Sequence, residues 1–210
     1  MIERDAKEGP ARCLGGRRCS ETVIAVTVLV TAIVALTICH AADRGTAAMS
    51  DPAVQLFVQI ATVLEHPRCM NCHTGEGFPR QGDDAHRHQF NVSRGPADTG
   101  APGLHCSTCH QAANQNFSGV PGAPSWQLAP RRMAWAGLSV GELCRALLDP
   151  SRGGMKADQF VPHFNTGLVQ WAWNPGMDSD GHARTRPPLT HKALIDLTQR
   201  WVAAGTKCPP

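Results

Sequence analysis

Two short stretches of the sequence hold the side chains best suited to chemistry, residues 69–73 (CMNCH) and residues 106–110 (CSTCH). Each has two cysteines three positions apart and a histidine directly after the second. Thiols at this spacing lie on one side of a helical turn, where they can reach the two vinyl groups of one porphyrin, and the histidine can then give iron an axial imidazole. The two motifs predict two covalently attached c-type haems. The predicted residues are Cys69, Cys72 and the proximal ligand His73 for the first, and Cys106, Cys109 and the proximal ligand His110 for the second.

Each haem iron needs a sixth ligand or keeps that position open for a substrate. We expect His88 at one iron, because its loop between the motifs can fold over a haem face without breaking a helix. We expect His163 at the other, because its apolar neighbours suit a haem edge. A methionine would raise the reduction potential relative to a second histidine. The alternatives that the sequence leaves open are His86, His66, His105, Met133, Met155 and Met177.

Two other uses of the same motifs remain open. An iron with a vacant sixth position would give a small peroxidase-like haem enzyme, although no distal acid–base set stands out in the sequence. Paired Cys-x-x-Cys stretches can also hold tetrahedral zinc, here through Cys69, Cys72, Cys106 and Cys109. The histidine that follows both pairs, and an oxidising compartment, count against the zinc-binding module.

The compartment follows from the N-terminal segment. Residues 22–38 are uninterrupted by charge, and Arg12, Arg17 and Arg18 precede them. This pattern predicts a secretory signal with a cleavage site after Ala41, or an uncleaved membrane anchor, with the rest of the chain outside the cytoplasm. We therefore expect a signal or anchor over residues 1–41, a flexible lead over 42–51 and a periplasmic or membrane-tethered domain over 52–210.

The remaining cysteines suggest one disulfide. Of the nine cysteines, four belong to the motifs, and Cys13, Cys19 and Cys39 lie in the signal or before it. Cys144 and Cys208 are left in the exported part, where an even pair is most simply a disulfide. Chain-entropy reasoning gives such a long loop about 3–4 kcal/mol of stabilisation. Two free buried thiols are the alternative.

The fold class expected is mainly α and loop-rich, a compact dihaem cytochrome c-type domain behind the N-terminal segment. Asp51 and Pro52 predict a helix start, residues 139–142 form a capping-box pattern, and Thr190 is placed to cap a final helix that stops at Gly205. A short helix is expected over residues 157–164, and loops over 74–105 and 114–130. With 20 glycines and 16 prolines the polypeptide core should be thin, so haem would supply missing apolar surface.

The net charge of the protein and several longer stretches of its sequence indicate what kind of partner it has. The net charge of +3 comes from scattered basic residues, which gives no support for nucleic-acid binding. Beyond the motifs, the chain resembles dihaem c-type cytochromes among bacterial proteins labelled isoquinoline 1-oxidoreductase subunit. The stretches that carry the resemblance are HPRCMNCH (66–73), PGAPSWQLAP (121–130), MAWAGLS (133–139), LCRALLDPSRGG (143–154), HFNTGLVQWAWNPG (163–176) and the closing residues 201–209.

The resemblance implies an electron-transfer subunit rather than a catalyst. Its name implies a cytochrome that receives electrons from a molybdenum hydroxylase, and this chain carries no molybdopterin-binding domain of its own. Any oxidation of a heterocycle or aldehyde would then belong to a redox partner protein. The function expected is transfer of electrons between a periplasmic or membrane-bound dehydrogenase or hydroxylase and the respiratory chain.

Overall fold

A computed structural model describes residues 49–210. The predicted signal or anchor over 1–41, and nearly all of the lead over 42–51, lie outside the described residues. Within residues 49–210 no helix has the length and apolar character needed to cross a bilayer. The described part is loop-rich, with about 42% helix and few strands.

The helices and strands are short apart from two helices of 13 residues, α2 and α7. The α-helices are α2 (Pro52–Leu64), α3 (Pro67–Met70), α4 (Val140–Leu148), α5 (Phe160–Phe164), α6 (Gly167–Gln170) and α7 (His191–Ala203). The 3-10 turns are η1 (Gln89–Asn91), η2 (Cys106–Thr108), η3 (Arg131–Met133), η4 (Pro150–Arg152), η5 (Ala157–Gln159) and η6 (Trp171–Trp173). Two antiparallel hairpins pair β1 (Arg80–Gln81) with β2 (His86–Arg87) and β3 (Gly100–Ala101) with β4 (Leu104–His105).

The predicted helix starts are confirmed by their caps. The Asp51 carboxylate accepts from the Ala53 N–H at 2.8 Å, and Thr190 Oγ1 accepts from the Ala193 N–H at 3.1 Å. The capping box at the start of α4 is complete, with Ser139 and Glu142 bonded in both directions. α2 ends at Leu64, and Pro67 opens α3, where the His66 side chain accepts from the Arg68 N–H as the N-cap.

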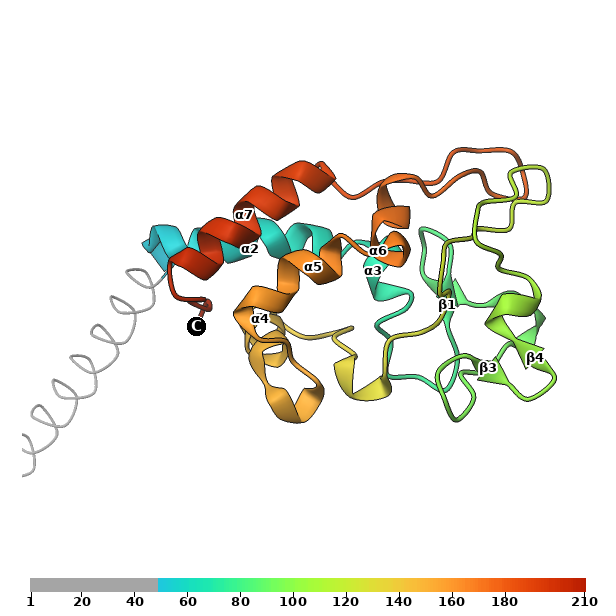
Figure 1. The fold of residues 1–210 in the computed structure, drawn as a ribbon, viewed down its shortest axis with the longest axis horizontal. Helices are drawn as coiled ribbons and strands as arrows, with labels where there is room; N and C mark the ends of the chain where they lie inside the picture. The colour runs from blue at the N-terminus through green and yellow to red at the C-terminus, as the bar shows by residue number, and fades with distance from the viewer. Residues whose placement is uncertain (1–48) are drawn as a thin grey trace, which may run out of the picture. The chain divides into compact units, whose positions relative to one another are not determined.

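The apolar core lies where α2 packs against α7 and α4, and where α5 packs against α7 (Figure 1). The rings of Phe57 and Trp201 meet in this core with centroids 5.0 Å apart and planes tilted by 46°. Both side chains are fully buried, as are Ile60, Leu143 and Leu194. We call α2, α4, α5 and α7 the helical half. The disulfide Cys144–Cys208, the pair expected from the sequence, fastens α4 to the end of the chain.

Residues 74–130, which we call the loop half, are built differently. They contain the two hairpins and the 3-10 turns η1 and η2. Their buried apolar side chains are limited to Ala123 and Leu128. A buried arginine, Arg94, holds this region instead, and its guanidinium bonds to segments on both sides of the second motif. The predicted irregular loops are thus largely confirmed, with two short hairpins added.

Candidate haem-binding sites

The two cysteine motifs adopt the same local turn. In the first, the N–H of His73 and the N–H of Cys72 both donate to the Cys69 carbonyl, at 3.1 and 3.2 Å. In the second, the corresponding donors bond to the Cys106 carbonyl. Those distances are 2.9 Å from His110 and 3.3 Å from Cys109. A single helical turn therefore sets both thiols and the histidine, once on α3 and once on η2.

Each motif histidine is held through the same ring nitrogen. His73 Nδ1 lies 3.0 Å from the Met133 carbonyl, and His110 Nδ1 lies 2.8 Å from the Pro121 carbonyl. A carbonyl oxygen can only accept, so in both rings the proton is on Nδ1 and the Nε2 lone pair is free. Among the described residues neither Nε2 has a hydrogen-bond partner. This is the tautomer that ligates a metal through Nε2 with its orientation fixed from behind.

A tryptophan lies flat against each motif histidine. Trp135 stacks on His73 with centroids 3.5 Å apart and planes at 14°, and Trp126 stacks on His110 at 4.6 Å and 9°. Ordinary aromatic core is the interpretation that the sequence favours for most of the five tryptophans, and the structure places these two against the motif histidines. The signal was present in the spacing, because each tryptophan follows within five residues the carbonyl that holds its histidine. Both sites therefore have the same arrangement, in which a backbone carbonyl holds the motif histidine and a tryptophan ring stacks on it.

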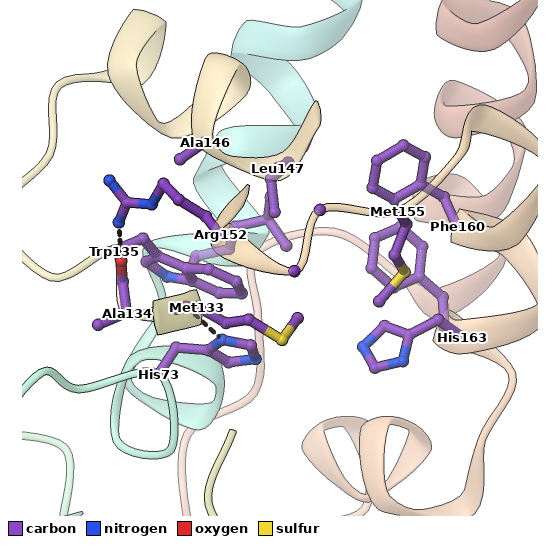
Figure 2. A pocket seen from close by; sticks show the side chains of 14 residues that line it. His73, Met133, Ala134, Trp135, Ala146, Leu147, Arg152, Met155, Phe160 and His163 are labelled. Atoms are coloured by element: carbon purple, nitrogen blue, oxygen red, sulfur yellow. Dashed lines mark hydrogen bonds between the residues drawn. The ribbon is translucent and has the colours of Figure 1, made fainter. Parts of the chain in front are cut away.

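An apolar cavity of about 30 Å³ opens beside His73 (Figure 2). His73, Trp135 and Met133 lie on one side of it, and Met155, Phe160 and His163 lie on the other. The rest of its lining is Leu64, Ala134, Ala146, Leu147, Arg152, Gly153, Gly154 and Phe164. Its lining is largely apolar, and its volume is that of a water-sized space, so a larger ligand would require the two sides to move apart.

The cavity brings three of the candidate distal ligands together. His163 lies across the cavity from His73, and its ring has no hydrogen bond among residues 49–210. Met155 lies on the same side as His163 and competes with it. Met133 sits on the side of His73, which its own carbonyl holds, so it lies poorly for a ligand opposite that ring.

At the second site the structure places His88 beside His110. Their ring centroids are 5.8 Å apart with planes at 76°. His88 Nδ1 lies 2.8 Å from the Gln89 carbonyl, so its Nε2 is free as well. Two imidazoles with free Nε2 atoms at this separation can share one metal, since a metal–imidazole bond is about 2 Å long. Phe90, close to His88 in the chain, is 85% exposed and gives this site apolar surface to cover.

The other histidine alternatives are engaged elsewhere. His86 is exposed and bonds to Asp84 at 2.6 Å. His66 uses both ring nitrogens: Nδ1 accepts from the Arg68 N–H at 3.2 Å, and Nε2 lies 3.4 Å from Thr185 Oγ1. His105 is exposed on β4. Of the seven non-motif histidines after residue 49, His88 and His163 are the ones that the structure brings to the motif histidines.

Burial keeps these groups neutral. It lowers the pKa of His73 to about 4, against a small opposing effect of the Met133 carbonyl. Burial also lowers the pKa of His110 and of His163. In the other direction, burial raises the pKa of the Cys69 thiol to about 12 and that of Cys72 to about 11. At neutral pH the imidazoles therefore keep the lone pair that a metal needs.

The two motifs are neighbours in space. Burial raises the pKa of the Cys72 thiol, and a charge on the Cys106 sulfur raises it further, so the two sulfurs lie within electrostatic range of each other. Arg94 joins the same two regions. Its guanidinium donates to the carbonyls of Thr74 and Glu76, just after the first motif, and to Asp98 in the loop before the second. Groups attached to the two motifs would lie close together.

In the described structure the four motif thiols are not grouped closely enough to hold one metal ion. Over residues 49–210, the one place where three or more His, Cys, Asp or Glu ligand atoms lie within 4.8 Å of one another is Asp178, Asp180 and His182. That group is a turn, in which the Gly181 N–H donates to the Asp178 carbonyl at 3.2 Å. Tetrahedral zinc needs four converging ligands, and the cysteines do not converge.

Comparisons with protein-family models, with curated protein sequences and with solved structures gave no match to this chain.

Proposed function

We propose that residues 52–210 form a c-type cytochrome domain with two covalently attached haems, exported to the periplasm and working in electron transfer. The observation that carries this proposal is the repeated unit at the motifs. Cys69, Cys72 and His73 on one side, and Cys106, Cys109 and His110 on the other, share one turn geometry. Both histidines present a free Nε2, and both are backed by a carbonyl and an indole.

The residues around each motif fit a haem group. The first site offers an apolar cavity against His73, and the second offers a pair of imidazoles with exposed apolar side chains next to them. A bound haem would supply one-electron redox chemistry at its iron. The chain's own part is to fix each proximal ring through Nδ1, to keep it neutral by burial, and to exclude water from the cavity with Leu147, Phe160 and Phe164.

The distal ligands proposed are His88 at the second site and His163 at the first. Two imidazoles at an iron give a lower reduction potential than one imidazole and one thioether. At the first site Met155 lies next to His163 and offers the thioether alternative. The proximity of Cys72 and Cys106 supports exchange of electrons between the two sites within the chain.

The partner is proposed from the family resemblance in the sequence. A dehydrogenase or hydroxylase, such as a molybdenum hydroxylase, would deliver electrons, and the respiratory chain would accept them. The N-terminal segment supports export with or without a retained anchor. Because the resemblance implies an electron-transfer subunit, the chain itself is proposed to carry electrons rather than to act on the organic substrate.

The experiment that tests the proposal is expression of the full chain together with haem-attachment machinery, followed by a pyridine haemochrome spectrum and intact mass. Two covalent haems per chain are expected. The C106S/C109S and C69S/C72S double variants are matched to each other and should each retain one haem. A wild-type protein that folds without covalent haem would contradict the proposal. A single haem per chain would show that one of the two motifs is not a haem attachment site.

A second candidate, a small peroxidase-like haem enzyme, is favoured by one observation at the first site. Outside the cavity, a surface groove lined by Met155, Gln159, Pro162, His163 and Thr166 shares two residues with it. A His163 ring without a hydrogen bond is also freer to leave a ligand position than the rings that carbonyls hold. A high-spin haem that reacts rapidly with peroxide would support the peroxidase-like function. Two low-spin, six-coordinate haems would favour the electron carrier.

A further inference from the structure

A fully exposed phenylalanine, Phe117, stands on a turn of the loop half. The turn closes where the Gln115 N–H donates to the Val120 carbonyl at 2.9 Å. Among residues 49–210, Phe117 is the most exposed of the large apolar side chains. Met177, whose N–H donates to Asn116 at 3.0 Å, is 39% exposed and extends the apolar surface. One exposed apolar side chain is ordinary by itself, so the setting of this pair decides its meaning.

The turn is fixed against residues 174–184, which run beside it at the end of the molecule remote from the C-terminus (Figure 1). Two further side-chain hydrogen bonds join the segments, from Asn114 Nδ2 to the Asn174 carbonyl at 2.7 Å and from Arg184 Nη2 to the Gly119 carbonyl. Gly119 has a φ of +67°, and a Cβ there would lie 2.3 Å from the Ser179 backbone nitrogen. The two backbones therefore touch, and the braced turn holds its phenylalanine ring in solvent.

The outward charges beside Phe117 are negative. Residues 111–126 contain no charged side chain, and the facing segment contributes Asp178 and Asp180. The backbone N–H of His182 lowers the pKa of the Asp178 carboxyl, which is ionised at neutral pH, and Asp180 is exposed. Arg184, the single arginine of the two segments, directs its guanidinium at backbone carbonyls. A partner with basic residues around its contact face would complement this surface.

Both ends of the same turn lead into the second candidate site. At one end, the Pro121 carbonyl holds His110 Nδ1 at 2.8 Å. At the other end, Asn114 Oδ1 accepts from Trp171 Nε1 at 2.9 Å. Trp171 meets Trp126 edge-on with centroids 4.8 Å apart, and Trp126 is the ring stacked on His110. A protein seated on the turn would therefore contact the segment that positions the proximal histidine.

We propose that Phe117 and Met177 form the docking surface for a redox protein whose contact face has an apolar pocket rimmed by lysine or arginine. The inference rests on the proposed function, since one electron passes across this contact and one protein is oxidised as the other is reduced. Phe117 fills the pocket, as aromatic anchors do at the centre of interfaces. Asp178 and Asp180 pair with the basic rim and speed the encounter. A second copy of this surface, or an anionic bilayer, would set like charges against each other.

The test mixes reduced full-length holoprotein in stopped flow with a ferric, lysine-rich cytochrome c as acceptor, and with the same acceptor after succinylation of its lysines. The wild type should reduce the native acceptor about tenfold faster than the succinylated one at low salt. Phe117→Ser should slow the native reaction about tenfold, with both midpoint potentials unchanged. Asp180→Asn should slow it about two- to threefold and weaken its dependence on salt.

The matched controls are Met49→Ser and Asp196→Asn, which change the same kinds of exposed side chain at the start of α2 and on α7. Both should stay within about twofold of the wild-type rate. A Phe117→Ser protein with two covalent haems and a rate within that range would overturn the inference. Equal rates with the native and succinylated acceptors would overturn the basic partner.

A second variant covers failure of Phe117→Ser to fold. Met177→Ser changes the neighbouring segment, whose bond to Asn116 uses the backbone, and should slow the native reaction about threefold. A wild-type dimer in sedimentation that Phe117→Ser dissociates would assign the surface to a second copy instead. Binding to phosphatidylglycerol vesicles that Phe117→Ser abolishes would assign it to a membrane, and either result overturns the inference. Failure of the proposed function looks different, because the wild-type protein would then carry no covalent haem, and the inference would fall with it.

Discussion

The helical half and the loop half support the same kind of motif by different physical means. Around His73, four helices bury a continuous apolar core and leave a cavity lined by their side chains. Around His110, short turns and hairpins bury two apolar side chains, and a buried arginine network holds them. The first half gains its stability from removing apolar surface from water. The second depends on polar links and on whatever covers its exposed apolar residues.

The largest effect should come from removing the cofactor on the loop side. In C106S/C109S we expect amides in residues 74–130 to exchange hydrogen at the rate of an unfolded chain, because little apolar burial remains to order them. Amides of α2 and α7 should keep their protection. Hydrogen exchange with mass spectrometry makes the measurement. Equal protection of both halves in C106S/C109S would contradict the expected difference between them. C69S/C72S is the matched control, in which the motif on the helical side is removed.

The next effect tests the arginine network. Arg94→Gln should destabilise the holoprotein by about 3–5 kcal/mol, because it leaves Asp98 unpaired and several carbonyls without donors in a buried place. Urea unfolding followed by fluorescence and by the Soret band measures it. The control Arg200→Gln should stay within about 0.5 kcal/mol of wild type. A loss equal to that of the control would mean that the loop half does not depend on this network.

The disulfide gives a smaller effect confined to the helical half. C144A/C208A should lower the free energy of unfolding by about 3–4 kcal/mol, since the bridge closes a loop of 64 residues in the unfolded chain. Covalent haem content should not change, because neither cysteine touches a motif. Calorimetry of oxidised and variant protein checks this. An equal loss of protection in the loop half would show that the two halves unfold as one unit.

The smallest effect concerns the start of α4. Ser139→Ala should cost about 1 kcal/mol through loss of the cap. Hydrogen bonds from the backbone and side chain of Ser139 lower the pKa of the Glu142 carboxyl. Ionised Glu142 therefore stabilises the fold above its unfolded pKa, and this contribution is lost as the pH falls through its folded pKa. The difference between wild type and Ser139→Ala should shrink in urea titrations as the pH falls below 4.5, and a constant difference would contradict the account.

What the sequence predicted well is what neighbouring residues decide. Capping at Asp51, Ser139 and Thr190 depends on side chains two or three positions away, so the helix starts are readable from the chain. The turn within each motif is local for the same reason. His88 was expected at a haem through the reach of its loop, and the structure sets it beside His110. Ligation by His88 and His163 stays a prediction.

What the sequence did not predict depends on distant partners. The Met133 carbonyl, which holds His73, lies 60 residues away in the chain, and no local sequence pattern indicates this contact. Arg68 and Arg94 were given no role, because arginine is ordinarily a surface residue and nothing in their neighbours marks them as buried. The competition between Met155 and His163 is likewise visible once α5 and the preceding turns fold against α2.

The backbone carbonyls that hold the two motif histidines also suggest the order in which the two sites form. His110 finds its acceptor 11 residues on, at Pro121, whereas His73 must wait for Met133. Closing the longer segment costs about 1.5 kcal/mol more in chain entropy. In the proposed export, the second motif would position its imidazole while later parts of the chain are still crossing the membrane. The first motif would reach its final geometry only after the segment through Trp135 has crossed, so the motif that comes later in the sequence would form first.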